Sequence, residues 1–174
     1  MKRNKNPISS QKHRGTAAQE DFVLDRQDRA ILRIVQRDNK TPQRTIAEQV
    51  NLSAAAVQRR IAAMEAAGVI ARNVAIVDPH AIAATITAIV EVQLVDERAA
   101  TADAAKALFR ETPDVQQCYY VTGGISFVLV IVALDMRVYE GLTRRLFAEN
   151  ELVKHYRTLI ALDRVKADSS IVVP

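Results

Sequence analysis

Side chains that can recognise the edges of base pairs gather in the segment that follows Ser53. Gln58 can form two hydrogen bonds with adenine, and the guanidinium group of Arg59 can bond guanine in the same way or contact a phosphate. Ala54 and Ala55 stand at the start of this segment and are small enough to allow close approach to a duplex. The residue types therefore predict a surface that reads DNA bases.

This surface requires a helix that fixes the directions of its side chains. Val57, Ile61 and Met64 recur at helical spacing and form one apolar stripe, so the glutamine and the neighbouring arginine lie on the opposite side. Ser53 is a residue type that caps helix N-termini, and Gly68 is typical of a helix end. We predict a helix between these two residues, with an inward apolar side and an outward polar side.

Two more helices are indicated before this one. Asp25 is placed to cap the first helix, with Asp28 in the capping-box position. Thr41 is expected to be the N-cap of the second helix, with Pro42 at its first helical position. Asn51 suits the left-handed conformation of the tight turn that follows. Three capped segments in this order predict a helix-turn-helix unit that places its third helix in the major groove.

Basic residues around the third helix suit the phosphate backbone, and the segment after it suits a wing. The sequence VIARNVAIVD is expected to form two short extended pieces, a small β-wing around Arg72 and Asn73. Arg44, Thr45, Arg60 and Arg72 are better placed for phosphates than for bases. The predicted DNA-contacting residues are therefore Arg44, Thr45, Ser53, Ala54, Ala55, Gln58, Arg59, Arg60 and Arg72.

The second half has a different periodicity, beginning with strict alternation from Thr85. The pattern predicts strands at 85–95, 115–122, 126–134 and 153–162, a helix at 98–111 and another capped by Asp135. The first helix is expected to bury Thr101, Ala104, Ala105 and Leu108, and the second to bury Val138, Leu142, Leu146 and Phe147. The resulting βαββαβ order is that of a ferredoxin-like α+β domain.

Such a sheet has helices on one face and leaves the other face uncovered. Apolar and aromatic side chains such as Tyr119 or Tyr120 are expected there, and an exposed apolar patch of this kind favours burial by a second copy. We therefore expect at least a homodimer, which would supply two recognition helices.

Charge divides unevenly along the 174 residues. Residues 1–80 hold 14 Lys and Arg against 8 Asp and Glu, whereas residues 81–174 hold 10 against 12, so the N-terminal half suits a polyanion. We predict a basic flexible tail at 1–22, a winged helix-turn-helix domain at 23–78, a hinge at 79–84 and the βαββαβ domain at 85–174. The tail is either a solvated terminus or an arm that follows DNA.

Both halves together resemble the Lrp/AsnC (leucine-responsive and asparagine-responsive, feast/famine) regulators of bacteria and archaea. The resemblance covers residues 24 to about 170 and rests on LDRQDRAIL, NLSAAAVQRRIAAMEAAGVI, DVQQCYYVTGG and LDRVKADSSIVV. It implies a transcriptional regulator of amino-acid-related genes. It also implies an amino-acid-regulation, or ACT-like, second domain that forms dimers and assembles to octamers.

In these regulators an amino-acid effector binds between subunits, near a turn with the pattern Gly, two variable residues, Asp and an aromatic. Gly123, Gly124, Ile125 and Phe127 match this pattern, but Ser126 stands in place of the acid. A serine hydroxyl offers the ammonium group of an effector a weaker bond than a carboxylate does. The effector residues that the resemblance implies are Tyr120, Thr122, Gly123, Gly124 and Ser126.

Other classes of function fit less well. His13, His80 and His155 lack the spacing of metal ligands or of a catalytic pair, and the single cysteine, Cys118, is expected to be packed in a strand. We expect no enzyme, no metal and no cofactor, a cytoplasmic location, and no membrane helix, because the longest apolar run is strand-sized. The remaining alternative is an architectural protein of the same fold that wraps DNA without sensing an effector.

Overall fold

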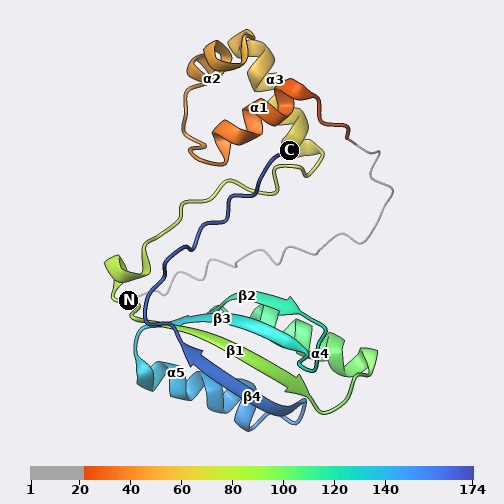
Figure 1. Ribbon diagram of the computed structural model, residues 1–174, viewed down its shortest axis with the longest axis vertical. Coiled ribbons are helices and arrows are strands. Elements are labelled where there is room, and N and C mark those ends of the chain that lie inside the picture. The colour runs from red at the N-terminus through yellow and green to blue at the C-terminus, as the bar shows by residue number, and fades with distance from the viewer. Residues whose placement is uncertain (1–21) are drawn as a thin grey trace, which may run out of the picture. The chain divides into compact units, whose positions relative to one another are not determined.

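The computed structural model describes residues 22–174 (Figure 1), which divide into two compact units. The first unit contains the described residues up to Val74 together with Asp168–Pro174, and the second contains Ala75–Ala167. The predicted basic tail, apart from Phe22, lies outside the described residues. Among the described residues, no helix combines the length and the apolar character needed to cross a membrane.

The first unit is built from helices α1 (Arg26–Val35), α2 (Gln43–Val50) and α3 (Ala54–Ala66). The predicted capping box is confirmed, since the backbone N–H of Asp28 donates to Asp25 Oδ1 at 2.8 Å and the Asp25 N–H donates to Asp28 Oδ2 at 3.1 Å. Asn51 has the predicted left-handed conformation, with φ 55°. Ser53 caps α3 as predicted, because its Oγ accepts from the backbone N–H of Ala56 at 3.2 Å.

Two local predictions in this unit differ from the structure. The N-cap of α2 is Pro42 rather than Thr41, whose hydroxyl donates instead to the carbonyl of Asp38 at 2.8 Å. The predicted β-wing is absent, since the described residues 69–78 contain no strand. Neither Arg72 nor Asn73 has the positive φ that a two-residue hairpin turn requires at its centre. The predicted hinge contains a short 3₁₀ helix, η1 (Pro79–Ile82).

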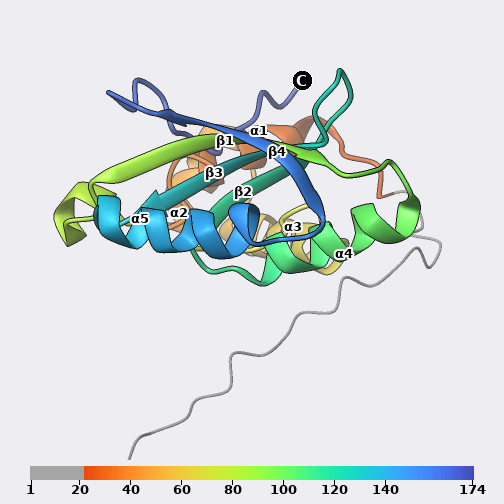
Figure 2. The same cartoon turned by 90° about the horizontal axis from the view of Figure 1, so that it is seen from below.

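The second unit is a four-stranded antiparallel sheet with helices on one face (Figure 2). Its strands are β1 (Ile86–Leu94), β2 (Val115–Tyr120), β3 (Phe127–Ala133) and β4 (Val153–Ile160), in the spatial order β2-β3-β1-β4. Helix α4 (Ala99–Glu111) precedes β2, and α5 (Met136–Thr143) continues into the π-helical turn η2 (Arg144–Ala148). The predicted α+β class and βαββαβ order are confirmed.

The two helices of this unit bury slightly different faces from those expected. In α4 the buried residues are Ala102, Ala105 and Phe109, whereas Ala104 is exposed. The ring of Phe109 packs edge-on against Phe127, with 5.3 Å between the centroids. Compared with the predicted face, the helix is turned about its axis so that its only aromatic residue, Phe109, enters the core. An aromatic side chain buries more area there than alanine does.

In α5, Tyr139 is buried in the core in place of the predicted Val138. Tyr139 is buried and Val138 is 38% exposed, although the periodicity had favoured the valine. The Tyr139 hydroxyl forms a 2.6 Å hydrogen bond with Thr158 Oγ1, so its polar atom is paired inside the core. Leu142, Leu146 and Phe147 are buried as predicted.

The last residues of the chain, Asp168–Pro174, contact the first unit, whereas the predicted domain of 85–174 includes them in the second. The side-chain amide of Gln36 donates to the carbonyl of Ile171 at 2.9 Å, and its oxygen accepts from the Ile171 N–H at 3.2 Å. Arg33 Nη2 donates to the carbonyl oxygen of Pro174 at 3.1 Å. The periodicity of residues 168–174 contains no signal of this return, because the partners lie more than 130 positions away in the sequence.

Candidate nucleic-acid interface

Helix α3 has one buried side and one exposed side, as the apolar stripe predicts. Val57 and Met64 are fully buried against Ile31 and Ile46 in the core of the first unit. The side that carries Ala54, Ala55, Gln58 and Arg59 is exposed. The side chains of Gln58 and Arg59 form no hydrogen bond with another described residue, so their donors and acceptors are available to an external partner.

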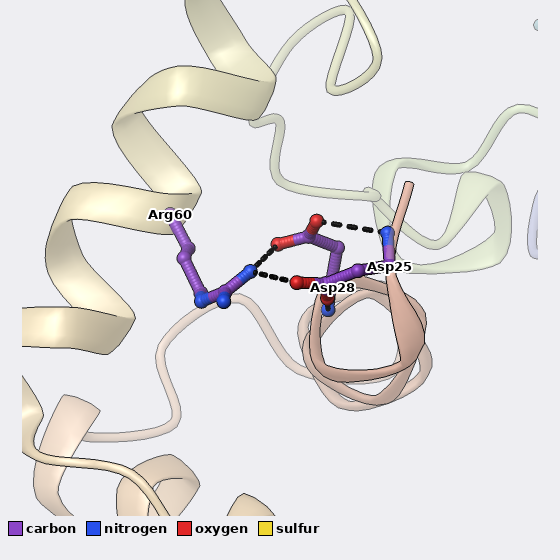
Figure 3. Close-up of polar contacts among 3 residues, drawn as sticks. All are labelled: Asp25, Asp28 and Arg60. Atoms are coloured by element: carbon purple, nitrogen blue, oxygen red, sulfur yellow. Dashed lines mark hydrogen bonds and ion pairs between the residues drawn. The ribbon is translucent and has the colours of Figure 1, made fainter. Parts of the chain in front are cut away.

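Arg60 has a different environment from its neighbours (Figure 3). Its Nη1 atom lies 2.7 Å from Asp25 Oδ2 and 2.7 Å from Asp28 Oδ1. The side chain of Asp28 is only 6% exposed, whereas that of Arg60 is 31% exposed, so water is largely excluded from the carboxylate of Asp28 but not from the arginine. A phosphate contact by Arg60 stays a prediction; in the structure its guanidinium group forms an ion pair that joins α3 to the beginning of α1.

The electrostatics of this cluster favour its charged form. The pKa of Asp25 lies below its usual value, first because its side chain accepts from the Asp28 N–H and second because it accepts from Arg60. The two carboxylates raise the pKa of Arg60, with Asp28 as the main cause. The guanidinium charge thus links α3 to the beginning of α1.

The sequence contained a signal for this pair that its periodicity alone does not reveal. The two acids form the predicted capping box and place negative charge at the positive end of α1. A basic residue on the flank of a neighbouring helix is a natural third partner for two adjacent carboxylates. Only the packing of α1 against α3 determines which of the consecutive arginines, Arg59 or Arg60, takes that place.

The other predicted phosphate contacts lie on exposed parts of the unit. Arg44 and Thr45 are exposed in the first turn of α2, and Arg44 forms only a surface ion pair with Glu48, at 3.3 Å. A pair of this kind contributes little and is easily exchanged. Arg72 is exposed in the extended segment after α3, even though this segment is not a β-wing.

The predicted effector residues fall into two groups. Thr122, Gly123 and Gly124 are exposed in the connection between β2 and β3, and both glycines have positive φ, 110° and 93°. Ser126 is half-buried, its Oγ accepts from the Leu94 N–H at 3.0 Å, and its own N–H donates to the Val92 carbonyl at 2.8 Å. A polar pocket of about 210 Å³ lies beside this serine and includes Gly124, Asp96 and Lys154.

Tyr120 is separate from that loop pocket. Cα pairing with Phe127 places it on the helix side of the sheet, and the two rings are 5.0 Å apart. Lys106 Nζ, from α4, lies 4.7 Å from the centroid of the Tyr120 ring. The structure therefore does not bring Tyr120 into one site with the glycine loop, the connection between β2 and β3 that contains Thr122, Gly123 and Gly124.

The uncovered face of the sheet carries apolar side chains around one ion pair. Of the two tyrosines, Tyr119 lies on this face, because it pairs with Val128 and is offset by one residue from Tyr120. Glu91 and Arg157 form a two-bond ion pair, with both Nε and Nη2 of the arginine 2.9 Å from the carboxylate, and this contact lowers the pKa of Glu91. The apolar members of this face include Ile89, Val128, Val130, Val132 and Leu159.

Cys118 and the histidines of the described residues are not part of a metal-binding cluster. Cys118 is exposed on the helix side of β2, contrary to the expectation that it is packed, because β2 is an edge strand with no further cover beyond it. Within the part of the chain that the structure describes, no three His, Cys, Asp or Glu side chains are grouped so that they could hold a metal ion.

Known proteins match both units. A winged helix-turn-helix DNA-binding model matches residues 24–71, and an Lrp/AsnC ligand binding domain model matches residues 87–171. An uncharacterized HTH-type transcriptional regulator of Sinorhizobium fredii is 43% identical over 148 residues, which are 85% of this chain and 88% of that protein.

Solved structures agree with these matches. An AsnC family transcriptional regulator from Agrobacterium tumefaciens has a TM-score of 0.80 and 29% identity, over 86% of this chain and 97% of that one. A feast or famine regulatory protein from Mycobacterium tuberculosis, in complex with L-methionine, has a TM-score of 0.78 and 28% identity, over 87% and 100%. The chain therefore belongs to the Lrp/AsnC family of DNA-binding transcriptional regulators, not to an enzyme family.

Proposed function

We propose that this regulator recognises specific DNA sequences with the exposed side of α3 and controls amino-acid-related genes. The observation that carries the proposal is the difference between two adjacent arginines. Arg60 is held by Asp25 and Asp28, whereas Arg59 and Gln58 are exposed and form no hydrogen bond with described residues. Side chains of this kind on a helix read base edges in the major groove.

Phosphate contacts would come from residues around the reading helix. Arg44 and Thr45 in α2 and Arg72 after α3 are exposed and free of buried partners. Ser53, Ala54 and Ala55 allow the start of α3 to approach the duplex closely. Phosphate contacts fix the position of a protein on DNA without distinguishing sequences.

The uncovered sheet face supports a homodimer. Ile89, Val130 and their apolar neighbours on this face would be buried by a second copy in a two-fold arrangement. A dimer then presents two α3 helices to major grooves about one helical turn apart, ~34 Å. Further assembly to an octamer is the arrangement that the family resemblance implies.

An amino-acid effector between subunits would regulate this assembly. The related feast or famine regulatory protein was solved with L-methionine, and the loop between β2 and β3 of this chain contains two positive-φ glycines. Thr122, Gly123 and Gly124 offer exposed backbone groups to a ligand. Coupling of about 1–3 kcal/mol between effector and DNA is sufficient for regulation.

Mutations of arginine on α3 and α2 test the division of roles. Binding sites would first be selected from random DNA by the purified protein, with and without an amino-acid mixture. Arg59→Ala should reduce the preference for selected over random DNA by about tenfold or more, whereas Arg44→Ala should weaken both alike. Arg137→Ala, on the surface of α5, is the matched control. Equal losses on both DNAs for Arg59→Ala would contradict the proposal.

A second candidate function is supported by Ser126. Its hydroxyl already accepts a hydrogen bond from Leu94, and it provides no carboxylate for an effector ammonium group. An architectural protein that bends DNA without sensing would tolerate this residue. Calorimetric titration with each of the twenty amino acids separates the two functions, because only a sensor binds one of them and changes its DNA affinity as a result.

A further inference from the structure

A pocket of about 390 Å³ lies in the second unit between helix α4 and the edge strand β2. Its volume is within the range of about 300–1,000 Å³ that is typical of small-molecule sites. It is separate from the pocket beside Ser126, with which it shares no lining residue. The residues that matter for its chemistry are Lys106, Phe109, Arg110, Cys118, Tyr120 and Phe127.

One aromatic ring offers an exposed apolar surface in this pocket. Tyr120 is 55% exposed, and its ring is backed at 5.0 Å by Phe127, which is fully buried together with Phe109. Flat apolar groups pack favourably against an exposed aromatic ring of this kind. The pocket therefore suits a ligand with an aromatic or similarly flat apolar body.

The charged residues of the pocket are all positive. Lys106 and Arg110 belong to its lining, and no Asp or Glu does. Lys106 Nζ donates to Asp103 Oδ1 at 3.0 Å, outside the pocket lining, and lies over the Tyr120 ring. Arg110 forms no hydrogen bond or ion pair with another described residue. Its guanidinium group is thus available for a bidentate bond to a carboxylate.

We propose that this pocket binds a small organic carboxylate that has a flat apolar body and no ammonium group. An α-amino acid is disfavoured here, because the pocket lining presents two cations and no acid to its ammonium group, and Asp103 is already paired with Lys106. The site therefore differs in ligand chemistry from the amino-acid site proposed at the glycine loop. It does not depend on that proposal.

Cys118 allows the site to be tested directly, because it is the only cysteine in the chain and forms part of the pocket wall. Partial desolvation raises the pKa of its thiol, so labelling by a maleimide at neutral pH is slow, and mass spectrometry follows the label on Cys118. Hydrocinnamate should slow the labelling of the full-length protein at saturation. L-phenylalanine adds only an ammonium group, and hydrocinnamyl alcohol lacks the charge; neither should slow it.

Variants and a second measurement complete the test. Arg110→Gln should weaken hydrocinnamate binding by about tenfold or more, both in Cys118 protection and in calorimetry. Arg137→Gln, an exposed arginine on α5, should leave binding unchanged. Absence of binding by either method would overturn the proposal, as would equal protection by L-phenylalanine. Equal protection by inorganic phosphate would show a general anion site and would also overturn it. None of these results bears on DNA binding or on the glycine loop.

Discussion

The Oδ1 atom of Asp28 lies 2.7 Å from the Nη1 atom of Arg60, which joins the first turn of α1 to the middle of α3. Asp28 is also part of the capping box of α1, so one carboxylate serves both a helix terminus and a contact between helices. Together with the apolar core beneath Val57 and Met64, this contact holds α3 against α1, with Gln58 and Arg59 on the exposed side.

Removal of the arginine should destabilise the first unit. Arg60→Met leaves the carboxylate of Asp28, which is 6% exposed, without its cationic partner, at a cost of about 1–3 kcal/mol in the free energy of unfolding. Arg59→Met removes an exposed side chain and should change it by no more than about 0.5 kcal/mol. Urea unfolding followed by circular dichroism measures both variants. Equal effects would show that the ion pair contributes nothing to stability.

The same cluster predicts a loss of stability in acid. The pKa of Asp25 is lower in the folded protein than in the unfolded chain, so its stabilising contribution is complete above the unfolded value of about 3.9. That contribution disappears as the pH falls through the lower, folded pKa. Asp25→Asn should therefore have a flatter dependence of unfolding free energy on pH in this acidic window than the unmodified protein. Parallel curves for the two proteins would refute the assignment.

Arg72 provides a test of phosphate contact beyond the helices. If it contacts a phosphate, Arg72→Ala should reduce the slope of log Kobs against log salt by about one and weaken specific and random DNA alike. Arg137→Ala, on α5, should leave the slope unchanged. Titrations by fluorescence anisotropy at several salt concentrations measure the slope. An unaltered slope for Arg72→Ala would exclude the contact.

The uncovered sheet face predicts where a dimer can be disrupted. Val130 lies on this face in β3, opposite Ile89 of β1. Val130→Asp would place a charge in the proposed interface and should weaken self-association by roughly a hundredfold or more. Val138→Asp adds the same charge to the exposed side of α5 and is the matched control. Sedimentation velocity should give a monomer for the first variant only; an intact dimer would place the interface elsewhere.

Ser126 is expected to have a structural role whether or not an effector binds. Ser126→Ala removes the acceptor of the Leu94 N–H and should cost about 1 kcal/mol of stability, whereas Ser126→Thr keeps a hydroxyl and should cost less. Thermal unfolding compares the two variants. A larger loss for threonine than for alanine would mean that space, rather than the hydrogen bond, limits this position.

Much of the fold could be predicted from the sequence because its signals are local. Capping by Asp25, Ser53 and Asp135 depends on groups three residues apart, and each was confirmed. The alternation in Ile86–Leu94 assigns the side chains of β1 to the correct faces, since successive residues of a strand point to opposite sides. Chemistry within one turn or one strand does not depend on the rest of the molecule.

The tertiary structure decided which of several locally equivalent residues is buried in the core or paired with a distant partner. Periodicity cannot determine that α4 buries Phe109, that Tyr139 replaces Val138, or that residues 168–174 return to Gln36. It also cannot distinguish Arg59 from Arg60, whose difference arises from carboxylates more than 30 positions away. These outcomes depend on free energies of burial and pairing between distant segments, and such energies are defined only once those segments are packed together.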